Sequence, residues 1–148
     1  MKVISWNIRD INGQSKHRLL RNKIFAKKPF IFLIQETKFF VEVLTKITSV
    51  CWKGYKSIAI DYIGTLGGLV ILWNPLEVIL ENYFATILTI SLHFHLVGTY
   101  QSGCVTIVYG PQTSNKKYFF LRMIHKIGEF IQDQHWIIGD EFNMITSL

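Results

Sequence analysis

The chain has 148 residues, of which 49 % are hydrophobic, 14 % aromatic and 18 % charged, a composition that excludes an intrinsically disordered segment and suits one domain or part of one. The formal net charge is +6 and is uneven: twelve of the sixteen Lys and Arg residues, but only three of the ten Asp and Glu residues, fall within residues 1–60. A basic leading section suits an anionic partner such as nucleic acid, and solvated lysines are the alternative explanation.

Cysteine use and the N-terminal sequence indicate the compartment. Cys51 and Cys104 are too few for a disulfide framework and have no paired metal-ligand spacing. Residues 1–7 lack the apolar stretch and small-residue cleavage site of a secretion signal. We therefore expect an intracellular protein, in the nucleus or the cytoplasm.

Residues 1–50 alternate between strand and helix patterns. Residues 2–6 are predicted to form a short strand, and Ser15 is a candidate N-cap for a basic helix that ends at Lys28, before Pro29. Residues 30–34 are continuously apolar, which is typical of a strand covered on both faces. A second helix is expected at about residues 40–50. In the first helix, the residues expected to face inward are Leu20, Ile24 and Phe25.

Residues 55–109 are rich in strand patterns separated by Gly and by Asn-Pro. They include most of a stretch without Asp, Glu, Lys or Arg, between Glu81 and Lys116, that is long enough to raise the question of a membrane span. Apolar and polar residues alternate strictly over residues 88–96, which predicts a strand with one wet face, so we expect no membrane association. The predicted strands are residues 57–61, 68–73, 76–80, 86–96 and 105–109.

The last part of the chain returns to a helix and then a strand. Residues 118–131 have one apolar stripe of helical spacing, and residues 136–138 form a short apolar strand. Helices interleaved with strands around a central run of hairpins predict an α/β layered sandwich with a mixed sheet. The stripe consists of Phe120, Ile124, Ile127 and Ile131.

Four short segments share one design, in which polar side chains follow directly after an apolar strand. Ends of strands are where α/β sheets collect their ligands, because the sheet fixes the backbone and the following loop frees the side chain. Each segment alone also fits an ordinary turn or loop. The segments are Ser5-Trp6-Asn7, Leu33-Ile34-Gln35-Glu36-Thr37, Val108-Tyr109-Gly110-Pro111 and Gly139-Asp140-Glu141-Phe142-Asn143.

Together and in order, these segments resemble the endonuclease/exonuclease/phosphatase superfamily, and within it the apurinic-type endonuclease domain of LINE-type non-LTR retrotransposons, especially the plant kind. The resemblance runs through the whole chain and implies an incomplete four-layer α/β sandwich: two packed mixed β-sheets flanked by helices, with the C-terminal part missing. Residues 1–148 would then be a single, C-terminally truncated domain. The residues that carry it are Ile4-Ser5-Trp6-Asn7-Ile8-Arg9, Leu33-Ile34-Gln35-Glu36-Thr37-Lys38, Gly67-Gly68-Leu69-Val70-Ile71-Leu72-Trp73-Asn74-Pro75, Val108-Tyr109-Gly110-Pro111, and Trp136-Ile137-Ile138-Gly139 running into Phe142-Asn143-Met144-Ile145.

The resemblance implies hydrolysis of a DNA phosphodiester assisted by Mg²⁺ or Mn²⁺, with no small-molecule cofactor and with the oligomeric state left open. Glu36 matches the metal carboxylate, which suits a hard cation, and Asn7 matches an amide that helps to hold the metal. Asn143 matches a second such amide, at the metal and the phosphate. Tyr109 matches a phenol that donates a hydrogen bond to the scissile phosphate.

Two further residues follow the metal ligands in the sequence. Arg9 and Lys38 are candidate contacts to the DNA backbone, and the alternative for Lys38 is a solvated side chain.

One departure from the family concerns the residue that orients the attacking water, an Asp in a Gly-Asp-Phe-Asn run. An alignment without a gap, which we favour, puts Glu141 at the Asp position, whereas the alternative keeps Asp140 and makes Glu141 an insertion. Either choice changes the carboxylate's reach, and a misplacement of about 1 Å can lower a rate by about 10²-fold.

A second departure concerns the family's Ser-Asp-His motif, whose His assists the attack. The motif has no counterpart in this sequence. We therefore expect a catalytically defective fragment, inactive or weakly active, of a retroelement endonuclease that nicks its target site. The alternative is a non-catalytic nucleic-acid-binding fragment or a relic with no selected activity. The histidines, which lie in or beside predicted helices or on the polar face of the alternating strand, are His17, His93, His95, His125 and His135.

Overall fold

Strands dominate the computed structural model, which describes residues 1–11, 13–38, 47, 50–61, 67–109, 114–131 and 135–139. The helix expected at residues 40–50 lies almost entirely outside the described residues. The elements in chain order are β1 (Val3–Asn7), α1 (Gln14–Lys27), β2 (Ile31–Gln35), β3 (Lys56–Ile60), β4 (Leu69–Trp73), β5 (Val78–Ala85), β6 (Thr89–Leu96), β7 (Ser102–Val108), α3 (Ser114–Phe130) and β8 (His135–Gly139).

The strands form two four-stranded sheets, in the orders β1-β2-β4-β3 and β5-β6-β7-β8. Each sheet is mixed, with one parallel pair: β1 with β2 in the first sheet and β7 with β8 in the second. The other neighbours are antiparallel. The prediction of mixed pairing is confirmed, and the described residues form the two sheets that the resemblance implies.

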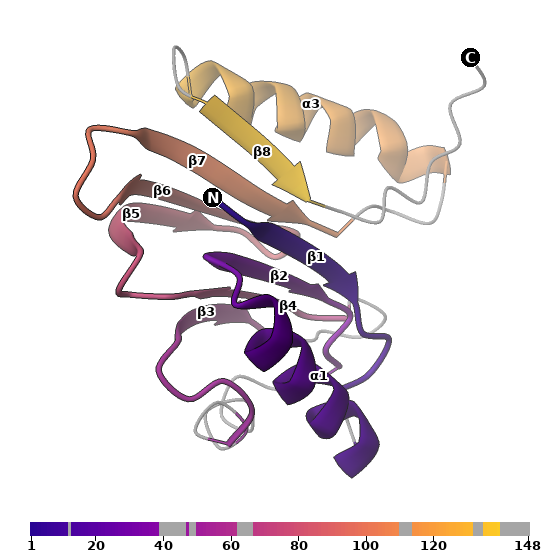
Figure 1. Cartoon of the computed structure of the whole chain (residues 1–148). Coiled ribbons are helices and arrows are strands. Elements are labelled where there is room, and N and C mark those ends of the chain that lie inside the picture. The colour runs from indigo at the N-terminus through magenta and orange to yellow at the C-terminus, as the bar shows by residue number, and fades with distance from the viewer. Residues whose placement is uncertain are drawn as a thin grey trace, which may run out of the picture.

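The two sheets pack face to face, with α1 outside the first and α3 outside the second, so the described residues form four layers (Figure 1). Strand β2 shows how the sequence produces this arrangement. Phe32 and Ile34 pack toward α1, while Ile31 and Leu33 pack against the second sheet. The continuous apolar run therefore has both faces covered, as predicted, and the four-layer α/β sandwich is confirmed for the described residues.

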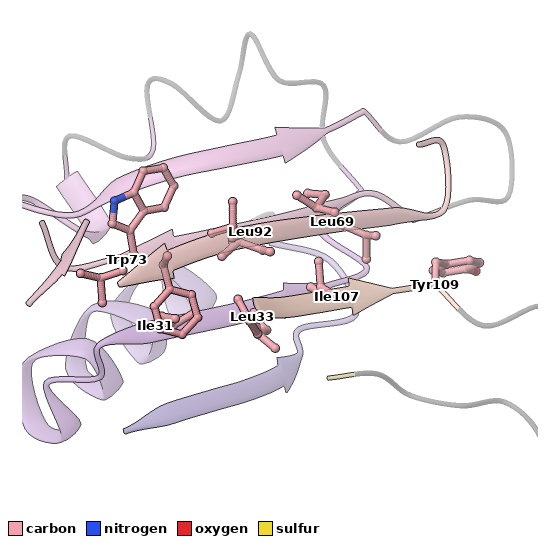
Figure 2. Packing of buried hydrophobic residues seen from close by; sticks show 12 residues of the cluster. Ile31, Leu33, Leu69, Trp73, Leu92, Ile107 and Tyr109 are labelled. Atoms are coloured by element: carbon pink, nitrogen blue, oxygen red, sulfur yellow. The ribbon is translucent and has the colours of Figure 1, made fainter. Parts of the chain in front are cut away.

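The core between the sheets is almost entirely aliphatic and aromatic (Figure 2). Strand β4 contributes its alternate residues Leu69, Ile71 and Trp73. Alternate apolar residues of β6 and β7 pack against them from the second sheet. Burying a large aliphatic side chain completely stabilises a fold by about 1.5–3 kcal/mol, so this layer supplies much of the stability. The residues from the second sheet are Val78, Ile90, Leu92, Phe94, Val105, Ile107 and Tyr109.

Helix α1 corrects two sequence predictions. Its N-cap is Gly13, at φ 96°, rather than Ser15, and no side chain caps the helix. Leu20 and Ile24 are buried as predicted, but Phe25 is 80 % exposed. The reason is geometric: one residue turns the helix by about 100°, which carries Phe25 past the face that meets the sheet. The helix ends one residue early, because Lys28 adopts a left-handed conformation before Pro29.

Strand β6 confirms the period-two prediction, but its polar face is wet only in part. Thr89 and Ser91 are buried, whereas His93 and His95 are half-buried. The Ser91 and Thr106 hydroxyl groups are 2.8 Å apart, and the indole Nε1 of Trp136 donates a 2.8 Å hydrogen bond to Thr106 Oγ1. Satisfied polar groups can thus line a buried layer. Neither described helix has the length and apolar composition that a membrane crossing requires.

Replacing Thr106 by Val tests this buried polar layer. The variant keeps the shape but leaves the Trp136 indole and the Ser91 hydroxyl without their partner, which should lower the free energy of unfolding by about 1–3 kcal/mol. The control, Thr99→Val, removes exposed bonds to Leu96 and Gln101 and should have a smaller effect. Urea unfolding followed by circular dichroism gives both values. Equal effects would contradict a structural role for the buried network.

Candidate active site

The parallel pairing of β1 and β2 brings Asn7 close to Glu36. Asn7 is in register with Gln35, so Glu36 is the next residue along the neighbouring strand. The pairing continues beyond the strands, since the Ile8 amide donates to the Gln35 carbonyl and the Ile11 amide to the Thr37 carbonyl, each at 3.1 Å. The two polar residues therefore lie on adjacent, hydrogen-bonded chain segments.

Glu36 is held in an unusual backbone conformation. Its φ is +53° and that of Lys38 is +55°, a region that side chains other than Gly, Asn and Asp seldom adopt. The Lys38 amide donates to the Gly67 carbonyl at 2.5 Å and the Thr37 amide to the Gly68 carbonyl at 3.4 Å. A methyl group on residue 67 would lie 2.9 Å from the Glu36 Cα, so only glycine fits there without displacing Glu36.

Asn7 closes a tight turn at the end of β1. Its side-chain oxygen Oδ1 accepts a 3.0 Å hydrogen bond from the Arg9 amide, and both Arg9 and Asp10 have positive φ. One layer inward, the buried Gln35 donates from Nε2 to Ser5 Oγ at 2.8 Å and ties the two strands together. Ser5 and Asn7 share the face of β1 that is turned toward the second sheet, because alternate residues of a strand point to the same side.

Tyr109 lies at the same end of the sandwich. It follows β7, is 8 % exposed, and its amide donates to the Leu88 carbonyl at 2.8 Å. Figure 2 shows its ring beyond the end of β7, at the end of the inter-sheet core where Leu69 lies. Since Leu69 pairs with Gln35, this is the end at which Glu36 leaves β2.

Strand β8 ends there too. Gly139 pairs with Ile107 at the end of β7, and a methyl group on residue 139 would overlap the Leu33 Cδ1 and lie 3.4 Å from the Ser5 Oγ. Strands β1, β2, β7 and β8 thus run toward one side of the molecule (Figure 1). The predicted site residues Asp140, Glu141 and Asn143 lie outside the described residues.

The other two predicted contacts, Arg9 and Lys38, are both exposed beside the ligand candidates. Sequence reasoning gave no role to Gln35, Ser5 or Gly67, which position Asn7 and Glu36. Two sequence signals point to Gln35 and Gly67. Gln35 is a polar residue at the end of an apolar strand, and Gly67 belongs to a Gly-Gly pair just before a strand, where glycine often marks a close backbone approach.

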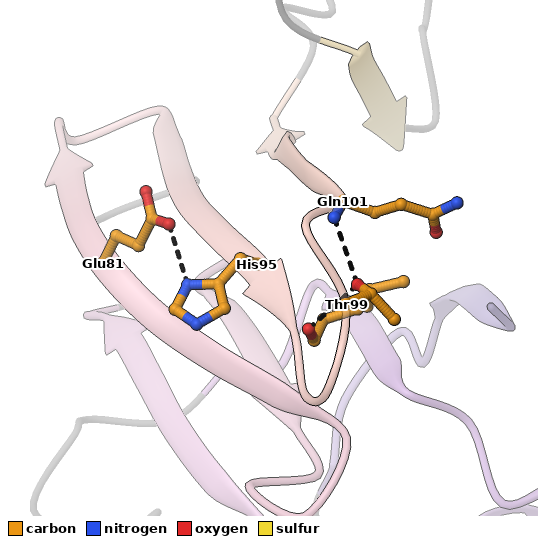
Figure 3. A network of polar contacts seen from close by, with 5 residues as sticks. Glu81, His95, Thr99 and Gln101 are labelled. Carbon is orange, nitrogen blue, oxygen red and sulfur yellow. Dashed lines mark hydrogen bonds and ion pairs between the residues drawn. The ribbon is translucent and has the colours of Figure 1, made fainter.

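The five histidines lie elsewhere. His95 is near the far end of β6, where its Nδ1 is 2.8 Å from the Glu81 carboxylate (Figure 3). His93 lies in the same half of β6, and His135 begins β8 at the end opposite Gly139. His125 pairs with Glu129 on the exposed face of α3, at 3.3 Å, and His17 is in α1 beside a cavity of about 300 Å³.

The cysteines are also unsuited to chemistry. Both are buried, and burial raises the pKa of Cys51 and raises that of Cys104 to about 11, so both remain neutral thiols at neutral pH. Among the described residues, no group of three or more His, Cys, Asp and Glu could hold a metal ion.

Comparison of the whole structure with solved proteins identifies the fold. It matches an endonuclease/exonuclease/phosphatase family protein from Bacteroides thetaiotaomicron, with a TM-score of 0.73, 15 % identity, and coverage of 100 % of this chain and 65 % of that one. It also matches D. rerio TDP2 complexed with single-strand DNA product, with a TM-score of 0.76, 12 % identity, and coverage of 99 % of this chain and 62 % of that one. A third match is the endonuclease domain of TRAS1, a telomere-specific non-LTR retrotransposon. Its TM-score is 0.71, with 15 % identity and coverage of 98 % of this chain and 61 % of that one.

These likenesses show that the chain has the endonuclease/exonuclease/phosphatase fold. It spans just under two thirds of the length of each of these three chains. No family model matches the sequence, and the comparison with curated proteins finds no match.

Gly67→Ala tests how Glu36 is held. The added methyl group must push against the Glu36 backbone, so the Thr37 and Lys38 amides should lose their bonds to Gly68 and Gly67 and exchange hydrogen at least about tenfold faster. The control is Gly128→Ala, whose methyl group would meet the Trp136 ring instead. Hydrogen exchange measured by NMR resolves both amides. Unchanged exchange at these two amides in Gly67→Ala would show that the close approach does not fix Glu36.

Proposed function

We propose that this chain carries the metal-binding part of a divalent-ion-dependent DNA endonuclease of the LINE-type retroelement kind. The observation that supports the proposal most strongly is the parallel pairing that puts Asn7 opposite Gln35, next to Glu36. Tyr109 and Gly139, from the second sheet, lie at the same end of the sandwich. The solved TRAS1 endonuclease domain, from a non-LTR retrotransposon, has the same fold and lends further support.

The donor atoms at this edge fit Mg²⁺ or Mn²⁺. Both ions prefer carboxylate and amide oxygens, and Mg²⁺ typically uses one or two carboxylates, keeps several waters and takes the rest of its ligands from substrate phosphate. Glu36 would provide the carboxylate and Asn7 an amide oxygen. The Asn7 oxygen already accepts a bond from the Arg9 amide, but an amide oxygen has two lone pairs. A bound ion would supply charge stabilisation at the phosphoryl and leaving 3′ oxygens.

The chain's own residues would then have distinct tasks. Gly67 and the Lys38 amide bond hold the backbone at Glu36, so its carboxylate would start from a fixed Cα and need less reorganisation during the reaction. Tyr109 donates its phenolic hydrogen to a non-bridging phosphate oxygen. Either Asp140 or Glu141 accepts a hydrogen bond from the attacking water and orients it, with Asn143 at the phosphate. Arg9 and Lys38 contact the flanking backbone phosphates.

We further propose that residues 1–148 belong to one domain of this kind and that activity of the chain alone is weak. The four layers formed by the described residues support the first statement. The second rests on the sequence, since no histidine stands in the family's Ser-Asp-His context and Glu141 or Asp140 has an altered reach. Losing one member of a group of catalytic residues that act together can remove most of the rate.

Plasmid nicking with Glu36→Gln tests the proposal. In Mg²⁺, the unmodified chain should convert supercoiled plasmid to the nicked form slowly, and the variant should lower that rate by about 10²-fold or more, because the metal carboxylate is lost. Glu81→Gln, which affects a carboxylate at the far end of β5 and β6 paired with His95, is the matched control and should keep the rate. Gel electrophoresis over hours gives both rates, with EDTA as the blank.

Two outcomes would contradict the proposal. Equal nicking by the Glu36 and Glu81 variants would place the activity elsewhere or in a contaminant. No metal-dependent nicking at any enzyme concentration, with DNA binding retained, would favour the alternative of a non-catalytic nucleic-acid-binding fragment.

A further inference from the structure

Helix α1 separates its positive charges into two rows. The helix contains five Lys and Arg residues and no Asp or Glu. Leu20 and Ile24 face the core, and the charges lie on either side of them. With 100° per residue, Lys16, Lys23 and Lys27 fall within about 40° of one another, while Arg18 and Arg21 fall on the other side of the buried stripe. The row of Lys16, Lys23 and Lys27 is called the lysine row below.

The lysine row lies along β1. The Lys16 ammonium is 6.0 Å and the Lys23 ammonium 5.1 Å from the centre of the Trp6 ring, distances at which a cation and an aromatic face attract. The Trp6 ring is itself held by an edge-to-face contact with Phe32, with ring centres 6.5 Å apart. The Lys16 and Lys23 ammonium groups are therefore positioned beside an aromatic ring.

The row also has a direction. At one end, the Lys16 ammonium donates a 2.6 Å hydrogen bond to the carbonyl of Ile8, the residue that follows Asn7. At the other end, the Lys2 ammonium donates to the Lys27 carbonyl at 2.8 Å and adds a fourth positive charge. Figure 1 shows α1 running antiparallel to β1. The row thus begins beside the candidate active site and leads away from it.

We propose that the lysine row, with Lys2 and Trp6, is a binding track for the sugar-phosphate backbone of DNA. From residue 16 to residue 27 the helix rises by about 16 Å, which is long enough for the row to contact more than one phosphate of a DNA strand. Lysine ammonium groups contact phosphates without reading sequence, so the track binds DNA of any sequence. Binding to the track does not require hydrolysis; only its role in leading DNA to Glu36 rests on the proposed function.

Salt-dependent binding distinguishes this track from a general effect of positive charge. The test variant is Lys23→Gln with Lys27→Gln, and the matched control is Arg18→Gln with Arg21→Gln, which removes the same charge from the same helix. Fluorescence anisotropy with a labelled duplex, in EDTA and from 50 to 200 mM salt, gives the affinity and its salt slope. Each lost phosphate contact lowers the slope by about 0.9, so the test variant should lose about two units of slope and at least about tenfold in affinity at 50 mM salt.

The control variant should keep the slope within about half a unit and lose less than about threefold in affinity. Lys23→Arg with Lys27→Arg, which keeps the charge, should restore binding, and thermal melts followed by circular dichroism check that every variant is folded. Equal losses in the test and control variants, or a folded test variant that binds normally, would overturn the track. Because EDTA removes the metal, this result is independent of whether Glu36 supports nicking.

Discussion

The inter-sheet core is the constraint on which the rest of the structure depends. Leu33 and Leu69 of the first sheet pack against Leu92 and Ile107 of the second, and this contact fixes how the two sheets lie relative to each other. Each sheet contains one parallel pair, so fixing the sheets also fixes where four strand ends meet. The candidate active site is a consequence of this packing. Its residues lie at the ends of strands whose apolar faces must be buried, and packing the two sheets together buries them.

The elements with the strongest local pattern were predictable from the sequence. The continuous apolar run that forms β2 predicts a strand covered on both faces, because five residues are too few for a typical helix and suit a fully buried strand. Features that depend on a partner element were not. Phe25 is exposed because the sheet meets the helix on a narrower face than its apolar residues suggest. Ser91 is buried against Thr106, which is bonded in turn to Trp136, on a face whose composition alone predicts contact with water.

The same distinction applies to the candidate site. The positions of Asn7, Glu36 and Tyr109 at the ends of strands were predictable, and the structure brings them to one end of the sandwich, while their roles stay predictions from the resemblance. The Gly-Gly pair signals a close backbone approach at Gly67, but its partner Glu36 was not predictable, since the contact joins residues 31 positions apart. Asp140, Glu141 and Asn143 stay predictions. The lysine row depends on both sequence and packing. The spacing of the lysines in the sequence puts them on one side of α1, and the packing of α1 beside β1 gives the row its direction.

The central claim is that Glu36 and Asn7 hold a divalent ion at the carboxyl ends of β1 and β2. Anomalous X-ray scattering from crystals of the chain soaked in Mn²⁺ tests this most directly. Mn²⁺ favours the same oxygen ligands as Mg²⁺, and its anomalous signal distinguishes it from water. We expect one strong anomalous peak in direct contact with the Glu36 carboxylate, next to the Asn7 amide. A site occupied only near His95 and Glu81, with none at Glu36, would contradict it.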